Sequence, residues 1–80
     1  MVNLPPPPPV IQSITLDGDT ATIQSSSTAG HSYQLEFLES MTDTIWKQVV
    51  PAVTATGDTV SLTNQLSGAS QRFYRVILLP

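Results

Sequence analysis

The chain has 80 residues, a net charge of −3 and no cysteine. This length allows one small domain, the lack of cysteine excludes a disulfide framework, and three Lys and Arg side chains leave no basic footprint for nucleic acid. Nineteen residues are Ser or Thr and nine are charged, a composition typical of exposed β-surface, so we expect an all-β fold.

The sequence offers neither a membrane anchor nor a leader. No apolar run approaches the roughly 18 residues needed to cross a bilayer, and prolines follow Met1 where a signal peptide has charged and apolar regions. We therefore expect no membrane insertion. A domain of this size without disulfides or a metal is marginally stable alone, so we expect support from a partner or an oligomer.

Residues 1–9 form the first predicted unit, an extended arm, and residues 10–80 the second, a β-domain. An unbroken proline run favours polyproline II, which extends about 3.1 Å per residue. The plain interpretation of this run is a linker. The functional interpretation is an attachment arm with two apolar anchors, made of Val2, Leu4, Pro5, Pro6, Pro7, Pro8 and Pro9.

The first strands form a predicted hairpin around Asp17-Gly18. Asp-Gly between alternating runs is typical of a type I′ turn, in which both central residues need positive φ. A two-residue loop at this place pairs Leu16 with Asp19 and Ile14 with Ala21. The inward face then holds Ile14, Leu16, Ala21 and Ile23.

Four further strands follow at spacings near ten residues, over residues 32–37, 45–50, 59–63 and 71–79. Pro51 is expected to end the fourth strand. The last strand is apolar on both faces, with Tyr74, Val76 and Leu78 on one face and Phe73, Arg75 and Ile77 on the other. It is therefore either central in its sheet or covered on one face by another subunit.

Together these elements predict a small antiparallel immunoglobulin-like β-sandwich of about six to seven strands with an extended Pro-rich N-terminal arm. No segment has a helical period, so no crossover helix is available for parallel pairing. We expect Trp46 and Tyr74 to be buried, each facing the other's sheet.

The sequence does not show the combinations of residues that a nucleophilic active site or a zinc site requires. His31 is the one histidine available as a base for a serine, and no cluster of His, Cys and carboxylate offers a zinc site. A pair of carboxylates for glycoside hydrolysis stays open, although so small a sandwich has little room for a cleft. We predict that the chain is not an enzyme and holds no cofactor or metal.

Two features allow a binding interpretation as well as a structural one. Asp17-Gly18-Asp19 resembles the start of a calcium loop, but the later ligand positions do not match, so a hairpin turn is favoured. Five aromatic residues offer a platform for sugar, but a small core needs them inside: Tyr33, Phe37, Trp46, Phe73 and Tyr74.

Three segments resemble the fibronectin type III-like modules that end many large exported proteins of environmental bacteria. They are Tyr33-Gln34-Leu35-Glu36, then Trp46, and then Arg72-Phe73-Tyr74-Arg75-Val76. The resemblance covers about residues 10 to 79 and implies a spacer or adhesive unit without catalytic residues. A β-sandwich behind an extended arm also resembles, in layout, the cement proteins that decorate bacteriophage capsids.

Two functional hypotheses follow. The first is a structural protein on a virion surface, a capsid decoration or fibre-type protein present in many copies or as a homo-oligomer. The second is an adhesion or glycan-binding module of an exported protein, outside the cell or on the bacterial surface. A Met1 start, the lack of a signal peptide and the arm favour the first, which is the main prediction. The motif resemblance favours the second, which is the alternative. In both, the predicted contacts to the protein assembly are the arm residues together with Phe73, Ile77 and Leu79.

Overall fold

The computed structural model describes residues 5–68 and 71–80, in which strands alternate with turns and no helix occurs. Six strands lie in this part of the chain: β1 Ile11–Asp17, β2 Thr20–Ser26, β3 Ser32–Leu38, β4 Lys47–Thr54, β5 Thr59–Gln65 and β6 Phe73–Leu78. The all-β prediction is therefore confirmed, with six strands rather than seven.

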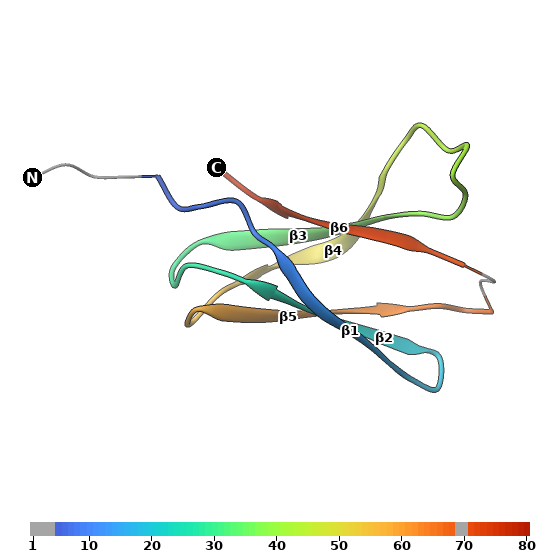
Figure 1. Cartoon of the computed structure of the whole chain (residues 1–80), viewed down its shortest axis with the longest axis horizontal. Helices are drawn as coiled ribbons and strands as arrows, with labels where there is room; N and C mark the ends of the chain where they lie inside the picture. The colour runs from blue at the N-terminus through green and yellow to red at the C-terminus, as the bar shows by residue number, and fades with distance from the viewer. Residues whose placement is uncertain (1–4, 69–70) are drawn as a thin grey trace, which may run out of the picture.

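The strands form two antiparallel sheets of three strands each, in the orders β1-β2-β5 and β4-β3-β6. Figure 1 shows the two sheets as layers, with β3, β4 and β6 above β1, β2 and β5. The layers have a sandwich-like arrangement, in which each sheet has one middle strand and two edge strands. β2 and β3 are the middle strands, while β1, β4, β5 and β6 are edges.

Side chains from both sheets fill the space between the layers. The buried hydrophobic residues come from β2, β3 and β5 and from the turn after β4, and they are Ala21, Ile23, Tyr33, Leu35, Ala55, Val60 and Leu62. The Tyr33 hydroxyl keeps a partner there, because it accepts a hydrogen bond of 2.8 Å from the Thr28 N–H. Inward-facing residues of β2, β3 and β5 thus form the core together with Ala55.

The first hairpin forms, but its predicted register is wrong. Asp17 pairs with Thr20, so Gly18 and Asp19 are the two loop residues, and Leu16 lies opposite Ala21. Of the two loop residues only Gly18 has a positive φ, at 60°, which fits a type II′ turn with glycine first rather than type I′. The shift is two residues, so the predicted inward face is preserved.

Pro51 does not end the fourth strand, contrary to the prediction, because it lies inside β4. The pairing with β3 is irregular around it, since the register shifts between Tyr33 opposite Val53 and Leu35 opposite Val49. Proline is accepted at this place because β4 is an edge strand with a bulge, where a missing N–H removes no regular ladder bond.

The prediction that Trp46 and Tyr74 are buried against each other's sheet is wrong. Both lie at the β4-β3-β6 sheet, and each is half-buried. Tyr74 points inward and packs against the core, whereas the Trp46 ring lies against the guanidinium of Arg75, 4.2 Å from its centroid. The fully buried aromatic residue is Tyr33. Trp46 precedes β4, so no strand alternation turns its side chain inward.

The two long sides of the sandwich differ. On one side the edge strands β4 and β5 approach each other closely, and we call this the closed side. On the other side the edge strands are β1 and β6, which make no comparable approach, and we call this the open side. In Figure 1, β1 slants away from β6 toward the β1–β2 turn. On the open side Ile14 and Leu16 are 49% and 68% exposed.

Candidate docking surface

The proline segment runs along the outside of the molecule. Residues 5–9 belong to no strand; three of these prolines are exposed and two, Pro6 and Pro9, are half-buried. The segment is joined to the sandwich at Val10, whose N–H donates to Ser26 Oγ (2.8 Å) and whose carbonyl accepts from the Ser26 N–H (2.9 Å). The predicted anchors Val2 and Leu4 lie outside the described residues.

One proline of the arm lies beside the end of the last strand. Pro6 lines a shallow groove with His31, Leu78, Leu79 and Pro80. The chain therefore brings part of the predicted arm and part of the predicted strand surface together, at the end of the molecule from which the arm extends in Figure 1.

The remaining predicted contact residues lie on the outer face of β6. Phe73, Ile77 and Leu79 alternate with side chains that pack on the core, and all three are half-buried. Among the strands that the structure describes, β6 is hydrogen-bonded to β3 alone, so its position is an edge rather than the centre of the sheet. An edge strand that is apolar on both faces is unusual without a cover, because such strands invite pairing with other chains.

An ion pair stands in the middle of this outer face. Arg75 Nη2 lies 2.7 Å from Glu36 Oε1, and the carboxylate side chain is 8% exposed whereas the arginine side chain is 45% exposed. Arg75 Nε donates to the same oxygen at 2.8 Å, which makes the contact two-pronged. The Trp46 ring also packs against the Arg75 guanidinium. Arg75 is therefore paired within its own sheet, although its side chain stays partly exposed on the outer face.

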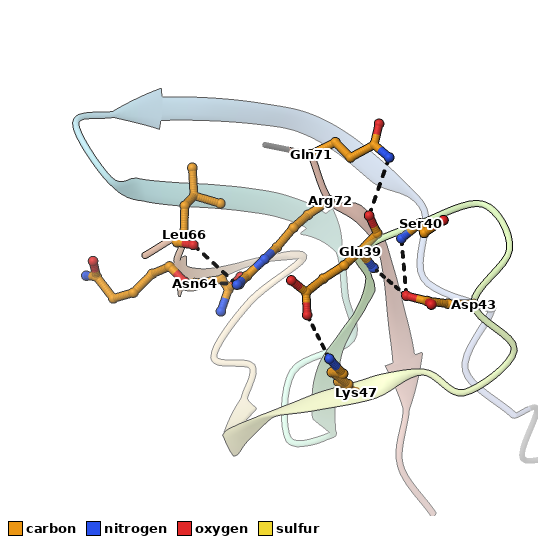
Figure 2. A network of polar contacts seen from close by, with 9 residues as sticks. Glu39, Ser40, Asp43, Lys47, Asn64, Leu66, Gln71 and Arg72 are labelled. Carbon is orange, nitrogen blue, oxygen red and sulfur yellow. Dashed lines mark hydrogen bonds and ion pairs between the residues drawn. The ribbon is translucent and has the colours of Figure 1, made fainter. Parts of the chain in front are cut away.

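A second polar cluster fastens the loop after β3 to the loop before β6, as Figure 2 shows. Asp43 accepts the N–H groups of Glu39 and Ser40 at 3.1 and 3.2 Å, which closes the loop on itself. The Gln71 amide donates to the Glu39 carbonyl at 3.4 Å. Lys47 pairs with Glu39 at 2.7 Å, and this contact lowers the pKa of Glu39 and raises the pKa of Lys47.

Arg72 makes the contacts that join this cluster to the end of β5. Its Nη1 donates to Asn64 Oδ1 and, at 3.0 Å, to the Gln65 carbonyl, so it holds the end of β5 to the start of β6. Its guanidinium also lies over the Phe37 ring, 4.2 Å from the centroid. The Tyr74 hydroxyl donates to the same Asn64 oxygen (2.9 Å), and burial raises the pKa of Tyr74. These contacts join neighbouring strands and loops of the fold, while the buried Arg72 Nε has no hydrogen-bond partner among the described residues.

The described residues show few features of a metal or ligand site. No group of three or more His, Cys, Asp and Glu side chains is placed to hold a metal ion in them. A hollow of about 180 Å³ between β4 and β5 is lined mainly by apolar side chains. No helix in this part of the chain has the length and hydropathy that crossing a membrane requires.

Sequence reasoning missed two features of this surface. The edge position of β6 depends on which strands pair across the sheet, and no local pattern encodes that pairing. The contact among Glu36, Arg75 and Trp46 had a visible signal, because Glu36 and Arg75 are charged residues at outward positions of β3 and β6. Opposite charges at outward positions of two strands indicate a cross-strand pair once the strands are known to be neighbours.

The comparisons with known proteins identify no relative: no family model, no curated protein and no solved structure matches the chain.

Proposed function

We propose that this chain is a non-enzymatic docking module, attached to a larger protein assembly through its proline arm and the outer face of β6. The observation that carries the proposal is the position of Pro6 beside Leu79, which joins the arm and the apolar strand into one surface. Exposed apolar surface next to an unpaired strand edge is typical of protein contact sites.

The arm is suited to attachment for two physical reasons. Proline fixes φ and has no N–H, so residues 5–9 cannot donate backbone hydrogen bonds to the domain's own sheets. An extended segment also loses less conformational entropy on entering a groove, because its shape is set before binding. The exposed prolines therefore favour a partner outside the domain over packing on its own core.

For the setting, we propose a fibronectin type III-like accessory module of an exported bacterial protein. The three segments that carry the resemblance assemble in one sheet. Tyr33-Gln34-Leu35-Glu36 lies in β3, the closing segment supplies β6 beside it, and Trp46 stacks on Arg75 of that strand. Residues that resemble a family motif and also contact one another support the resemblance more strongly than scattered matches.

A second setting, decoration of a virus capsid, is favoured by the arm. Cement-type attachment needs a segment that reaches a neighbouring subunit, and residues 5–9 lie outside the sandwich with three exposed prolines. In this setting the outer face of β6 lies against the capsid and the chain is present in many copies.

Truncation tests the arm. Removal of residues 1–9 should leave the melting temperature within about 2–3 °C of the intact chain, since none of the buried core residues is removed. The same truncation should lower co-sedimentation with the envelope fraction of the source cells or with intact virions at least tenfold. Normal binding by the truncated chain would overturn the attachment role, and loss of folding would show that the arm packs on its own domain.

Antibody labelling separates the two settings. An antibody raised against the 80-residue chain should label the surface of intact source cells if the module belongs to an exported protein. Labelling of purified virus particles would replace that setting with capsid decoration. A signal that appears only after the cells are lysed, with no labelling of particles, would contradict both settings.

A further inference from the structure

The unpaired edge of β6 carries a defined set of backbone groups. The Leu79 N–H donates to the Ser32 carbonyl at 2.9 Å, so residue 79 directs its backbone groups toward β3. In an antiparallel ladder these directions alternate along the strand. Residues 73, 75, 77 and 79 therefore bond to β3, whereas Tyr74, Val76 and Leu78 direct their N–H and carbonyl groups away from it, toward the open edge.

The other three edges are less suited to pairing. β4 contains Pro51 and a register shift, and β1 has a register shift near its start. A proline and a register shift each interrupt a regular ladder of hydrogen bonds. β5 is regular, but it lies on the closed side against β4 and its outward residues are polar. β6 alone combines a regular ladder with apolar side chains on both faces.

We infer that β6 is a self-association edge, and that a second copy of this chain pairs with it antiparallel about a two-fold axis at Val76. This inference goes beyond the proposed docking role, because it concerns two copies of one chain and makes no use of the arm.

Hydrogen-bond geometry selects this register. With Val76 opposite Val76 of the second copy, Tyr74 lies opposite Leu78 of that copy, and every outward N–H meets an outward carbonyl. A slip by one residue sets outward groups against inward ones. A slip by two residues toward the C-terminus brings Tyr74 opposite Pro80, which has no N–H to donate. The register at Val76 satisfies the whole edge.

The charges select the same register. Arg75 then lies opposite Ile77 of the second copy, with its own charge already paired to Glu36. A slip by two residues toward the N-terminus sets the two Arg75 side chains opposite each other, and directly opposed like charges destabilise a sheet. The remaining outer pair, Phe73 opposite Leu79 of the second copy, is apolar.

The exposed side chains of β1 fit an added strand as well. Ile14 and Leu16 point to the inward face of their own sheet, yet they are 49% and 68% exposed because no segment among residues 5–68 and 71–80 covers that side. A second copy extends the β4-β3-β6 sheet beyond β6 on this open side. Association therefore reduces the exposed apolar surface in addition to completing the ladder.

The first experiment is sedimentation equilibrium of the unmodified 80-residue chain between about 1 µM and 1 mM. The expected result is a reversible monomer–dimer equilibrium, since two-fold pairing uses up the edge and forms a closed dimer. A monomer over the whole range would overturn the inference, and so would an open series of larger oligomers. The same dimer should form after removal of residues 1–9, which distinguishes this inference from the role of the arm.

A pair of charge variants tests the register. Ile77→Lys sets a cation opposite Arg75 of the second copy, whereas Ile77→Glu sets a carboxylate there, so the lysine variant should dimerise at least about tenfold more weakly than the glutamate variant. Thr63→Lys, on the outer face of β5, is the control and should dimerise like the unmodified chain. Equal weakening by Lys and Glu at position 77 would overturn the register.

Cross-linking provides an independent readout, because the chain has no cysteine of its own. Phe73→Cys with Leu79→Cys in one chain should give a covalent dimer on mild oxidation, since the two positions oppose each other across the two-fold axis. Each single variant should give at least fivefold less covalent dimer under the same conditions. Equal cross-linking by a single variant would overturn the pairing.

Discussion

The closed and open sides of this sandwich come from strands with the same kind of sequence. β1 and β2 both alternate polar and apolar residues, and they pair so that Leu16 lies opposite Ala21. Ala21 is fully buried, whereas Leu16 is 68% exposed. The difference lies in what stands across the sandwich: β2 is a middle strand under the second sheet, and β1 is an edge strand that slants away from β6. Alternation selects a face, and position in the sheet decides whether that face is covered.

The largest expected effect is a difference in the free energy of unfolding between two Leu→Ala substitutions, one in the core and one on the open side. Leu35→Ala, in the core beside β4, should lower the free energy of unfolding by about 2–5 kcal/mol, because it leaves a cavity in packed surroundings. Leu16→Ala on the open side should cost less than about 0.5 kcal/mol, as exposed substitutions do. Urea unfolding at about 1 µM chain measures both. A large cost at Leu16 under these conditions would mean that the open side is covered within the single chain.

The ion pair on the outer face of β6 gives the next effect. Arg75→Met leaves the carboxylate of Glu36 nearly buried without its cation, which should cost about 1–3 kcal/mol. Adding Glu36→Gln to Arg75→Met should restore part of that loss, because the amide carries no charge to be left unpaired. Urea unfolding of the two single variants and the double variant checks this. Equal stability of Arg75→Met and the double variant would contradict the pairing.

Two glycines in turns allow a further comparison, of the stability lost when each is replaced by alanine. Gly18, at φ 60° in the turn joining β1 to β2, sits where a side chain is strained, so Gly18→Ala should cost about 1 kcal/mol. Gly57, in the turn joining β4 to β5, has no positive φ and open space around it, so Gly57→Ala should be neutral or slightly stabilising. Thermal melting of both variants is the measurement. Similar losses at both positions would show that φ is not the cause.

Trp46 gives a smaller effect than its size suggests. Trp46→Ala removes a half-buried ring from Arg75 and should cost about 0.5–1 kcal/mol, in contrast to the 3–5 kcal/mol of a core aromatic residue. Its fluorescence should be quenched by acrylamide in the folded chain, since the ring lies outside the core. A blue-shifted emission that resists quenching would place the ring inside.

The smallest effect is the pH response of the exposed pair of Glu39 and Lys47. The pKa of Glu39 is lowered in the folded chain, so the pair's contribution is present above the ordinary carboxylate pKa and is lost as the pH falls through the lowered value. Lys47→Met should remove this part of the acid dependence and change stability little at pH 7. Melting curves from pH 7 to pH 3 check it, and they should converge in 1 M salt.

Local sequence patterns predicted where the strands lie and which face of each strand is apolar, and they placed the first turn to within one residue. Alternation predicted all six strands within a few residues of their bounds, and the outward set of β6 was correct because the side-chain period is fixed at two. The hairpin was located by Asp17-Gly18, although its loop begins one residue later. These features depend on residues that are close together in the sequence.

The tertiary structure alone decided which strands are edges. Because β1 is an edge, Ile14 and Leu16 are exposed, and because β4 is an edge, Pro51 can lie inside a strand. The edge position of β6 leaves a row of its backbone groups unpaired among the described strands. It also set Glu36 beside Arg75, from strands that are far apart in the chain. Each outcome depends on pairing between distant segments, where hydrogen bonds and burial over the whole molecule outweigh local preference.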